Sequence, residues 1–205
     1  MRHVRRGGVA ARQLSYRACV KVGELVPAAL ADAIVRDGTG GEHRLGDAWA
    51  TRDALVIFVR HFACAGCAEH VAALRPRLAE LAQLDVGVIV VGSGTPDQLA
   101  GFIEREAIAT AFTDPTLAAY RAAKLVRSRW SAYGPRALAQ LARALLRGFA
   151  NGRPQGDPIQ QGGTLYVARD GVLRFYDRAE ATGDHASLGD VVDVALARRA
   201  LEAVA

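Results

Sequence analysis

The feature of this sequence that most constrains its fold is an apolar run that ends in two cysteines and then opens a helical pattern. The run Ala54–Val59 is mostly branched or aromatic, as is typical of a strand buried on both faces. Cys64 and Cys67 follow with C-x-x-C spacing, and helical periodicity begins at Ala68. Because unpaired backbone N–H groups converge at a helix start, their partial positive charge favours thiolate over thiol. The pattern therefore predicts a reactive thiol pair at a strand-to-helix junction.

The four residues around this junction have distinct expected roles. Cys64 is the expected attacking thiol because the first position at a helix start is usually the exposed one, and Cys67 is its resolving partner. Arg60 is expected either to lower the pKa of Cys64 or to bind an acidic substrate group. His61 is a candidate general acid or base. The alternatives are an ordinary surface charge for Arg60 and a merely supporting side chain for His61.

The same stretch also reads as a zinc motif. His61, Cys64, Cys67 and His70 spell H-x-x-C-x-x-C-x-x-H. Four ligands within ten residues need a tight turn, whereas the chain from Ala68 onward favours a helix, on which only Cys67 and His70 would share a face. Redox chemistry is therefore preferred over metal binding, and neither a metal nor a cofactor is expected.

The order of the predicted elements indicates the fold. After the thiol pair come helix 68–84 with a kink at Pro76, strand 86–91, helix 97–107, strand 111–113, helix 116–126, a break at 127–134 and amphipathic helix 135–149. Asp170-Gly171 joins strands 164–168 and 172–176 into a hairpin, and helix 188–204 closes the chain. A further hairpin, 31–35 with 42–45, precedes the central strand. This order predicts an α/β, thioredoxin-like fold: a central mixed sheet flanked by helices, with an N-terminal hairpin extension.

Composition bounds the class of protein. Residues 1–20 are expected to form a basic N-terminal extension and residues 21–205 one thioredoxin-like domain, since 205 residues with 51% hydrophobic content can bury a real core. The net charge of +5 comes without a dense basic block, so no nucleic-acid partner is expected. No apolar run approaches the ~20 residues that span a bilayer, and no signal-peptide core is visible, so we expect no membrane partner and a cytoplasmic location. Cys19 is expected to be an idle thiol, with a second resolving role as the alternative.

Three stretches resemble a known family. Residues 58–67, the Gln160–Val167 segment with its Gly162-Gly163 pair, and Gly183-Asp184-His185 are similar to the peroxiredoxin-like branch of the alkyl hydroperoxide reductase and thiol-specific antioxidant (AhpC/TSA) family. This resemblance implies a thioredoxin fold and thiol-dependent redox chemistry, and the residues expected to face a substrate are Gly162, Gly163, Thr164 and His185. Peroxiredoxins place Thr or Ser three residues before the peroxidatic cysteine. Here Cys64 stands at that position if Cys67 is the peroxidatic cysteine, and His61 stands there if Cys64 is.

The leading hypothesis is a thiol–disulfide oxidoreductase in which Cys64 attacks a disulfide and Cys67 resolves the mixed intermediate. A peroxidase or endoperoxide reductase, and a thiolate-catalysed isomerase of a conjugated small molecule, are the enzymatic alternatives. A zinc-binding or partner-binding module on the same scaffold is the non-enzymatic one. The expected partners are a small-molecule or protein disulfide or peroxide and a thiol reductant, with a homodimer through helix 136–149 as an option.

Overall fold

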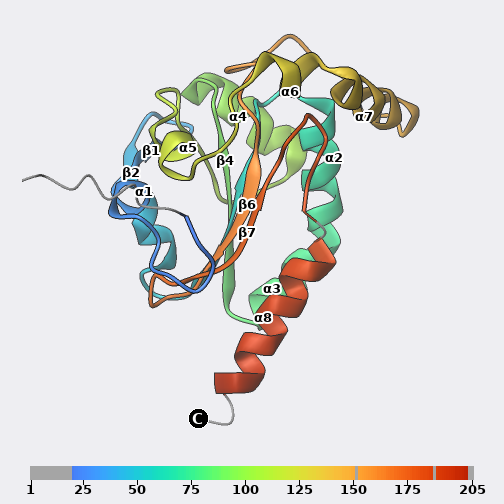
Figure 1. The fold of residues 1–205 in the computed structure, drawn as a ribbon. Coiled ribbons are helices and arrows are strands. Elements are labelled where there is room, and N and C mark those ends of the chain that lie inside the picture. The colour runs from blue at the N-terminus through green and yellow to red at the C-terminus, as the bar shows by residue number, and fades with distance from the viewer. Residues whose placement is uncertain (1–19, 151, 187, 203–205) are drawn as a thin grey trace, which may run out of the picture.

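The computed structural model describes residues 20–150, 152–186 and 188–202. At its centre lies a seven-stranded sheet in the order β2-β1-β5-β4-β3-β6-β7 (Figure 1). The strands are β1 (Ile34–Arg36), β2 (Glu42–Arg44), β3 (Asp53–Phe58), β4 (Val86–Gly92), β5 (Ala111–Thr113), β6 (Gly163–Val167) and β7 (Leu173–Arg178). Strands β3, β4 and β5 are parallel, whereas β6 is antiparallel to β3. The predicted thioredoxin-like α/β fold with a mixed sheet is confirmed.

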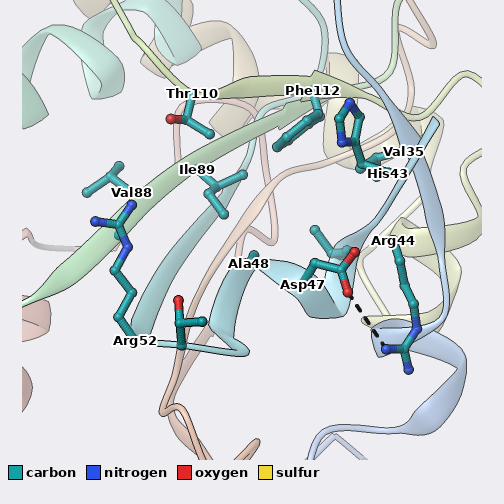
Figure 2. A pocket seen from close by; sticks show the side chains of 13 residues that line it. Val35, His43, Arg44, Asp47, Ala48, Arg52, Val88, Ile89, Thr110 and Phe112 are labelled. Carbon is teal, nitrogen blue, oxygen red and sulfur yellow. Dashed lines mark ion pairs between the residues drawn. The ribbon is translucent and has the colours of Figure 1, made fainter. Parts of the chain in front are cut away.

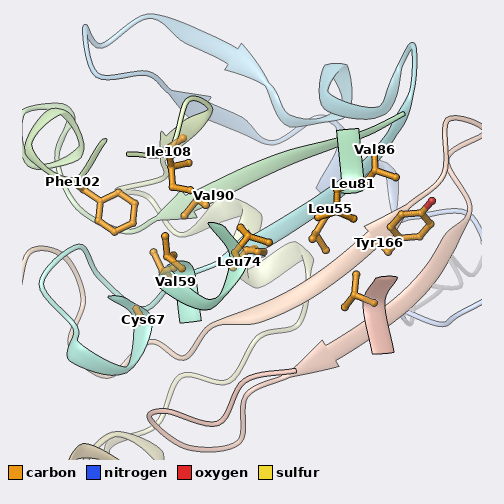
Figure 3. Packing of buried hydrophobic residues seen from close by; sticks show 14 of the residues in the cluster. Leu55, Val59, Cys67, Leu74, Leu81, Val86, Val90, Phe102, Ile108 and Tyr166 are labelled. Atoms are coloured by element: carbon orange, nitrogen blue, oxygen red, sulfur yellow. The ribbon is translucent and has the colours of Figure 1, made fainter. Parts of the chain in front are cut away.

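Helices cover both faces of this sheet. They are α1 (Ala28–Ala31), α2 (Ala65–Leu74), α3 (Leu78–Gln83), α4 (Pro96–Glu106), α5 (Ala118–Ala122), α6 (Arg129–Tyr133), α7 (Pro135–Leu146) and α8 (Leu188–Glu202), with 3-10 helices η1 (Leu45–Trp49) and η2 (Arg75–Arg77). Residues of α2, α3, α4 and α8 pack on one face, as Figure 3 shows for Leu74 and Phe102. Residues of α1, η1 and α5 pack on the other.

The central strand β3 explains why the sequence pattern is apolar on both faces. Every residue of β3 is buried, and its side chains alternate between the two hydrophobic clusters. Burying an aliphatic or aromatic side chain stabilises the fold by about 1.5–3 kcal/mol, so β3 is a major stabilising element. Its carboxyl end leads directly into the segment that carries Arg60 and Cys64.

The start of β3 is fixed by a buried carboxylate. Asp53 accepts hydrogen bonds from the Tyr166 hydroxyl at 2.5 Å, the Arg169 backbone N–H at 2.9 Å and Arg198 Nε at 2.7 Å. The Arg198 contact joins α8 to the base of the central strand, and three donors compensate for the burial of one charge.

Several local predictions are confirmed. The hairpin β1–β2 turns at Asp37, whose carboxylate accepts from the backbone N–H groups of Thr39 and Gly41, both at 2.9 Å. The long helix predicted after the cysteines is interrupted at Pro76, which lies in η2 between α2 and α3. Proline has no N–H to continue the helical ladder, and its ring excludes the preceding carbonyl.

Other segments differ from the prediction. The expected break at 127–134 contains α6, which Ser128 caps by accepting from the Ser131 backbone N–H at 3.3 Å. The helix expected over 116–126 shrinks to α5 because Leu117 and Lys124, with φ of 59° and 58°, are left-handed at its two ends. The expected N-terminal extension and Cys19 lie outside the described residues, apart from Val20.

Among the described residues, no helix is both long enough and apolar enough to cross a bilayer. The predicted cytoplasmic location and the domain boundary at residue 21 stay predictions.

Candidate active site

The two cysteines occupy the start of α2. Cys64 is the N-cap residue, with extended backbone angles, and α2 begins at Ala65, earlier than the predicted Ala68. Cys67 therefore lies inside the first turn, and both thiols are free and buried. This position gives Cys64 the backbone N–H groups of a helix start, as the sequence predicts.

Arg60 contacts both sulfur atoms. Its backbone N–H donates to Cys67 Sγ at 3.3 Å, and its Nη1 donates to Cys64 Sγ at 3.8 Å. The guanidinium is itself buried, with 6% of the residue exposed. One residue at the end of the central strand thus holds the two thiols by two different groups.

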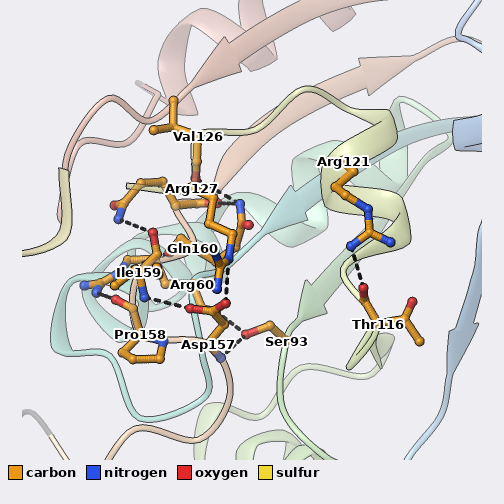
Figure 4. A network of polar contacts seen from close by, with 11 residues as sticks. Arg60, Ser93, Thr116, Arg121, Val126, Arg127, Asp157, Pro158, Ile159 and Gln160 are labelled. Carbon is orange, nitrogen blue, oxygen red and sulfur yellow. Dashed lines mark hydrogen bonds and ion pairs between the residues drawn. The ribbon is translucent and has the colours of Figure 1, made fainter. Parts of the chain in front are cut away.

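A polar network fixes this arginine in place (Figure 4). Arg60 Nε donates to the Gln160 carbonyl at 3.3 Å, and Nη2 donates to the Pro158 carbonyl. Ser93 Oγ donates to the Arg60 carbonyl at 2.6 Å and accepts from the Asp157 backbone N–H at 3.0 Å. Sequence reasoning missed Ser93, Asp157 and Pro158; the only signal was a Gly- and Pro-rich loop, which does not identify its partner.

The environment separates the acidities of the two thiols. A hydrogen bond from Cys67, the nearby Arg60 cation and the backbone N–H groups of Cys67 and Gly66 outweigh burial and lower the pKa of Cys64 to about 6. The hydrogen bond to Cys64 and complete burial raise the pKa of Cys67 well above its usual value. Near neutral pH the stable state is a Cys64 thiolate beside a protonated Cys67.

A small pocket leads to only one of these sulfurs. Its volume is about 90 Å³, room for several water-sized molecules. It is lined by Arg60, His61, Cys64, Gly66, Ala132, Tyr133, Ala137, Leu138, Leu141, Pro154, Pro158 and Thr182. Cys64 is 2% exposed and lines the pocket, whereas Cys67 does not. Helices α6 and α7 therefore form one wall of the access route to Cys64.

His61 faces this pocket as a neutral imidazole. Burial, followed by the neighbouring Arg60 cation, lowers the pKa of His61 to about 4. Its Nδ1 accepts from the Ala63 backbone N–H at 3.3 Å, which fixes the ring orientation and leaves the proton on Nε2.

The predicted substrate-facing glycines lie in the sheet. Gly163 begins β6 and pairs with Phe58, and Thr164, which is buried, pairs with Ile57. A side chain at Gly162 would collide with the Phe58 carbonyl, so glycine is needed for this close approach to the central strand. None of Gly162, Gly163 and Thr164 lines the thiol pocket, and their substrate-binding role stays a prediction.

His185 packs against helix α2. Its ring stacks on His70 of α2 with centroids 4.5 Å apart and planes at 15°. Both Nε2 atoms are buried, and neither has a hydrogen-bond partner among the residues that the structure describes. Burial, the largest cause for each, lowers the pKa of His70 to about 3 and that of His185 to about 4. Gly66 and Gly183 let the loop that carries His185 approach α2 closely; an ideal Cβ on Gly66 would lie 3.1 Å from Gly183 Cα. A role for His185 in substrate binding stays a prediction.

Two further features bear on the site. Within the described ranges, no group of three or more His, Cys, Asp and Glu side chains is arranged to hold a metal ion. A second pocket, of about 250 Å³, lies at the opposite end of β3 and β4, where Arg44, Arg52, Ile89 and Phe112 line it (Figure 2). It contains neither thiol, so the candidate active site is the small pocket at Cys64.

The fold and the paired buried thiols define a thioredoxin-fold, thiol-dependent oxidoreductase. The sequence model of the AhpC/TSA antioxidant enzymes matches residues 73–180, just over half of the chain. The chain belongs to this AhpC/TSA family. The match begins within α2, after both cysteines, so the thiol roles are argued from the geometry of this chain.

Relatives agree with this family assignment, and a solved structure agrees with the fold. Mouse Peroxiredoxin-like 2C is 29% identical over 184 residues, covering 84% of this chain and 81% of the mouse protein. Thioredoxin-like protein AAED1, chloroplastic, from Arabidopsis thaliana is 28% identical over 116 residues, 56% of this chain and 47% of that protein. Peroxidoxin BcpB from Mycobacterium tuberculosis has the same fold, with a TM-score of 0.64 at 16% identity, covering 87% of this chain and 98% of that one.

Proposed function

We propose that this protein reduces a small hydroperoxide, with Cys64 as the attacking thiolate and Cys67 as the resolving thiol. The observation that carries the proposal is that the low-pKa sulfur opens onto a pocket of only about 90 Å³. A peroxide group fits such a pocket, whereas a protein disulfide needs an exposed sulfur and Cys64 is 2% exposed. The AhpC/TSA membership favours the same substrate class.

The chemistry balances with the groups present and an external thiol. Cys64 thiolate attacks the terminal oxygen of R–O–OH; the S–O bond forms, the O–O bond breaks, and the alkoxide leaves as alcohol after taking a proton from water. The Cys67 thiol then attacks the sulfenic sulfur. The S–S bond forms, the S–O bond breaks, and the Cys67 proton leaves with hydroxide as water. Two thiols of a reductant supply the electrons and protons that restore the pair.

Arg60 and His61 have separate roles in this scheme. The Arg60 guanidinium stabilises the Cys64 thiolate and then faces the negative charge that develops on the peroxide oxygens. The neutral His61 ring, with its proton on Nε2, donates a hydrogen bond to the bound peroxide, in the place where relatives use a hydroxyl. The absence of Thr or Ser at position 61 is then a substitution of one donor for another.

The test is a rapid-mixing oxidation followed by intact mass. With excess hydrogen peroxide, the wild-type chain should lose two mass units as the disulfide forms. Cys67→Ser should stop at the sulfenic acid, trapped as a dimedone adduct on residue 64, and Cys64→Ser should remain unmodified. A Cys64→Ser chain that still consumes peroxide at the wild-type rate would refute the proposal.

The second candidate is the thiol–disulfide oxidoreductase predicted from the C-x-x-C spacing. The close Cys64–Cys67 hydrogen bond favours it, because a resolving thiol is already in place. One experiment distinguishes the two candidate functions: the rate at which hydrogen peroxide oxidises Cys64 is compared with the rate at which oxidised glutathione does so. Faster reaction with glutathione disulfide would favour this second function.

A further inference from the structure

Exposed apolar side chains gather on α6 and α7. We define the α6–α7 patch as Trp130, Tyr133, Leu138, Leu145 and Leu146, which are exposed by 75%, 56%, 58%, 49% and 89%. Single exposed apolar residues are ordinary, but five on two consecutive short helices are a feature that marks an interaction surface.

The way α7 sits on the body explains this exposure. Ala137 and Ala144, two turns apart, are buried against the body, and small side chains there let the helix lie close. Leu138 and Leu145 follow each of these by one residue, so they project together along one flank. Figure 1 shows α6 and α7 at one end of the molecule, with α7 running outward past α2.

The same segment is strongly cationic. From Arg127 to Arg153, the stretch that forms and flanks α6 and α7, the sequence has no acidic residue and six basic ones: Arg127, Arg129, Arg136, Arg143, Arg147 and Arg153. Acids from outside α6 and α7 pair with part of this charge. Glu69 meets Arg143 and Arg147, Asp184 meets Arg136, and Asp157 meets Arg127. Among the described residues, three carboxylates against six cations leave the segment positive.

We propose that the α6–α7 patch docks this protein on the surface of an anionic lipid bilayer. Trp and Tyr favour the headgroup region because their rings are apolar and their N–H and O–H groups stay hydrated. Leucines on the same surface insert beside them, and the surrounding arginines attract anionic headgroups. The sequence predicted no membrane partner because no segment could span a bilayer; docking on its surface requires no such segment.

The patch adjoins the route to Cys64. Tyr133 and Leu138 line the thiol pocket as well as belonging to the patch. Docking therefore turns the pocket mouth toward the lipid, so that an amphiphilic hydroperoxide dissolved in the bilayer reaches Cys64. This delivery step rests on the proposed function, whereas docking itself does not.

The experiment uses Trp130 as the reporter. The other tryptophan, Trp49, is buried, so the difference between the spectra of wild type and Trp130→Phe isolates the exposed ring. The full chain is titrated with phosphatidylcholine vesicles that contain either none or about 30% phosphatidylglycerol. The expected result is a blue shift of the Trp130 emission only with the anionic vesicles, weakened by added salt.

Two triple variants sharpen the test. L138S/L145S/L146S should weaken the vesicle partition at least about tenfold, since three inserted side chains are lost. The matched control V22S/L25S/L196S removes exposed apolar side chains outside α6 and α7 and should bind as wild type does. Cys64→Ser should also bind normally, which separates docking from the thiol chemistry.

Several results would overturn the proposal. They are the absence of a shift with anionic vesicles, equal binding by the L138S/L145S/L146S variant, and loss of binding in the V22S/L25S/L196S control. A blue shift that instead grows with protein concentration in the absence of lipid would assign the patch to a second copy of the chain.

Discussion

Replacing Arg60 with methionine should raise the pKa of Cys64 by about one to two units. Methionine keeps much of the buried volume and leaves the backbone N–H that donates to Cys67 Sγ. What it removes is a cation 3.8 Å from Cys64 Sγ. The sign is fixed: a cation stabilises the thiolate, so its loss favours the thiol and moves the pKa upward.

The magnitude follows from the distance. Two unit charges about 4 Å apart interact by about 4 kcal/mol at an effective dielectric constant of about 20, equivalent to about three pKa units. The guanidinium also donates to the Gln160 and Pro158 carbonyls, which weakens its effect on the sulfur. The helix-start N–H groups and the Cys67 hydrogen bond remain in the variant. We therefore expect a pKa of roughly 7–8 in place of about 6, so the thiolate fraction at about pH 7 falls from about nine-tenths to between a tenth and a half.

The assay is the pH dependence of alkylation. Iodoacetamide adducts are counted by intact mass, and peptide mapping assigns them to residue 64. Arg60→Lys keeps the charge and should stay close to wild type, and Arg121→Met, which neutralises an exposed arginine of α5, is the control for net charge. A midpoint in Arg60→Met within about 0.3 units of wild type would refute the assignment of Arg60 as the thiolate's counter-charge.

Three further predictions concern stability, each measured by urea denaturation. The free energy of unfolding of Asp53→Asn should be about 3 kcal/mol lower than that of wild type, because the substitution breaks the buried charge pair with Arg198. Gly92→Ala should lower the free energy of unfolding by about 1–3 kcal/mol, since the added Cβ would collide with the Phe62 ring. An unchanged denaturation midpoint would contradict this prediction and would mean that the ring moves freely. The pKa of His70 is about 3 in the folded protein against an ordinary value of 6.5. Between these two pH values only the unfolded chain binds a proton at His70, so the free energy of unfolding falls as the pH drops below 6.5. His70→Asn should make that fall shallower by about 1.4 kcal/mol per pH unit.

Local patterns predicted much of the fold. The apolar run of β3, the kink at Pro76 and the hairpin turn at Asp170-Gly171 each depend on neighbours in sequence, so propensity and periodicity were enough. Helix α6 was missed because five residues are too short to show a period. Its only signal was Ser128 as a cap.

The candidate active site was likewise predicted only in part. The thiol pair and Arg60 were predicted because they are contiguous with the strand end. The carbonyls that hold the guanidinium come from Pro158 and Gln160, about a hundred positions downstream, and only the folded sheet brings them together. The stacking of His185 on His70 was unpredictable for a related reason: it depends on the approach of Gly183 to α2, and a glycine in a loop does not reveal what it will pack against.

Glycines allow close approaches among the segments that flank the thiol pair, and this indicates where the site can adapt. Gly66 meets Gly183, Gly162 meets the Phe58 carbonyl, and Gly92 lies under the Phe62 ring, all without room for a Cβ unless a neighbour shifts. Close-packed interiors transmit strain and tolerate little added volume, so side chains added at these glycines would disturb the segments that position the thiols. The wall formed by α6 and α7 carries large exposed side chains and has no such restriction. We therefore expect differences in substrate, or in the surface that delivers it, to be accommodated at α6 and α7.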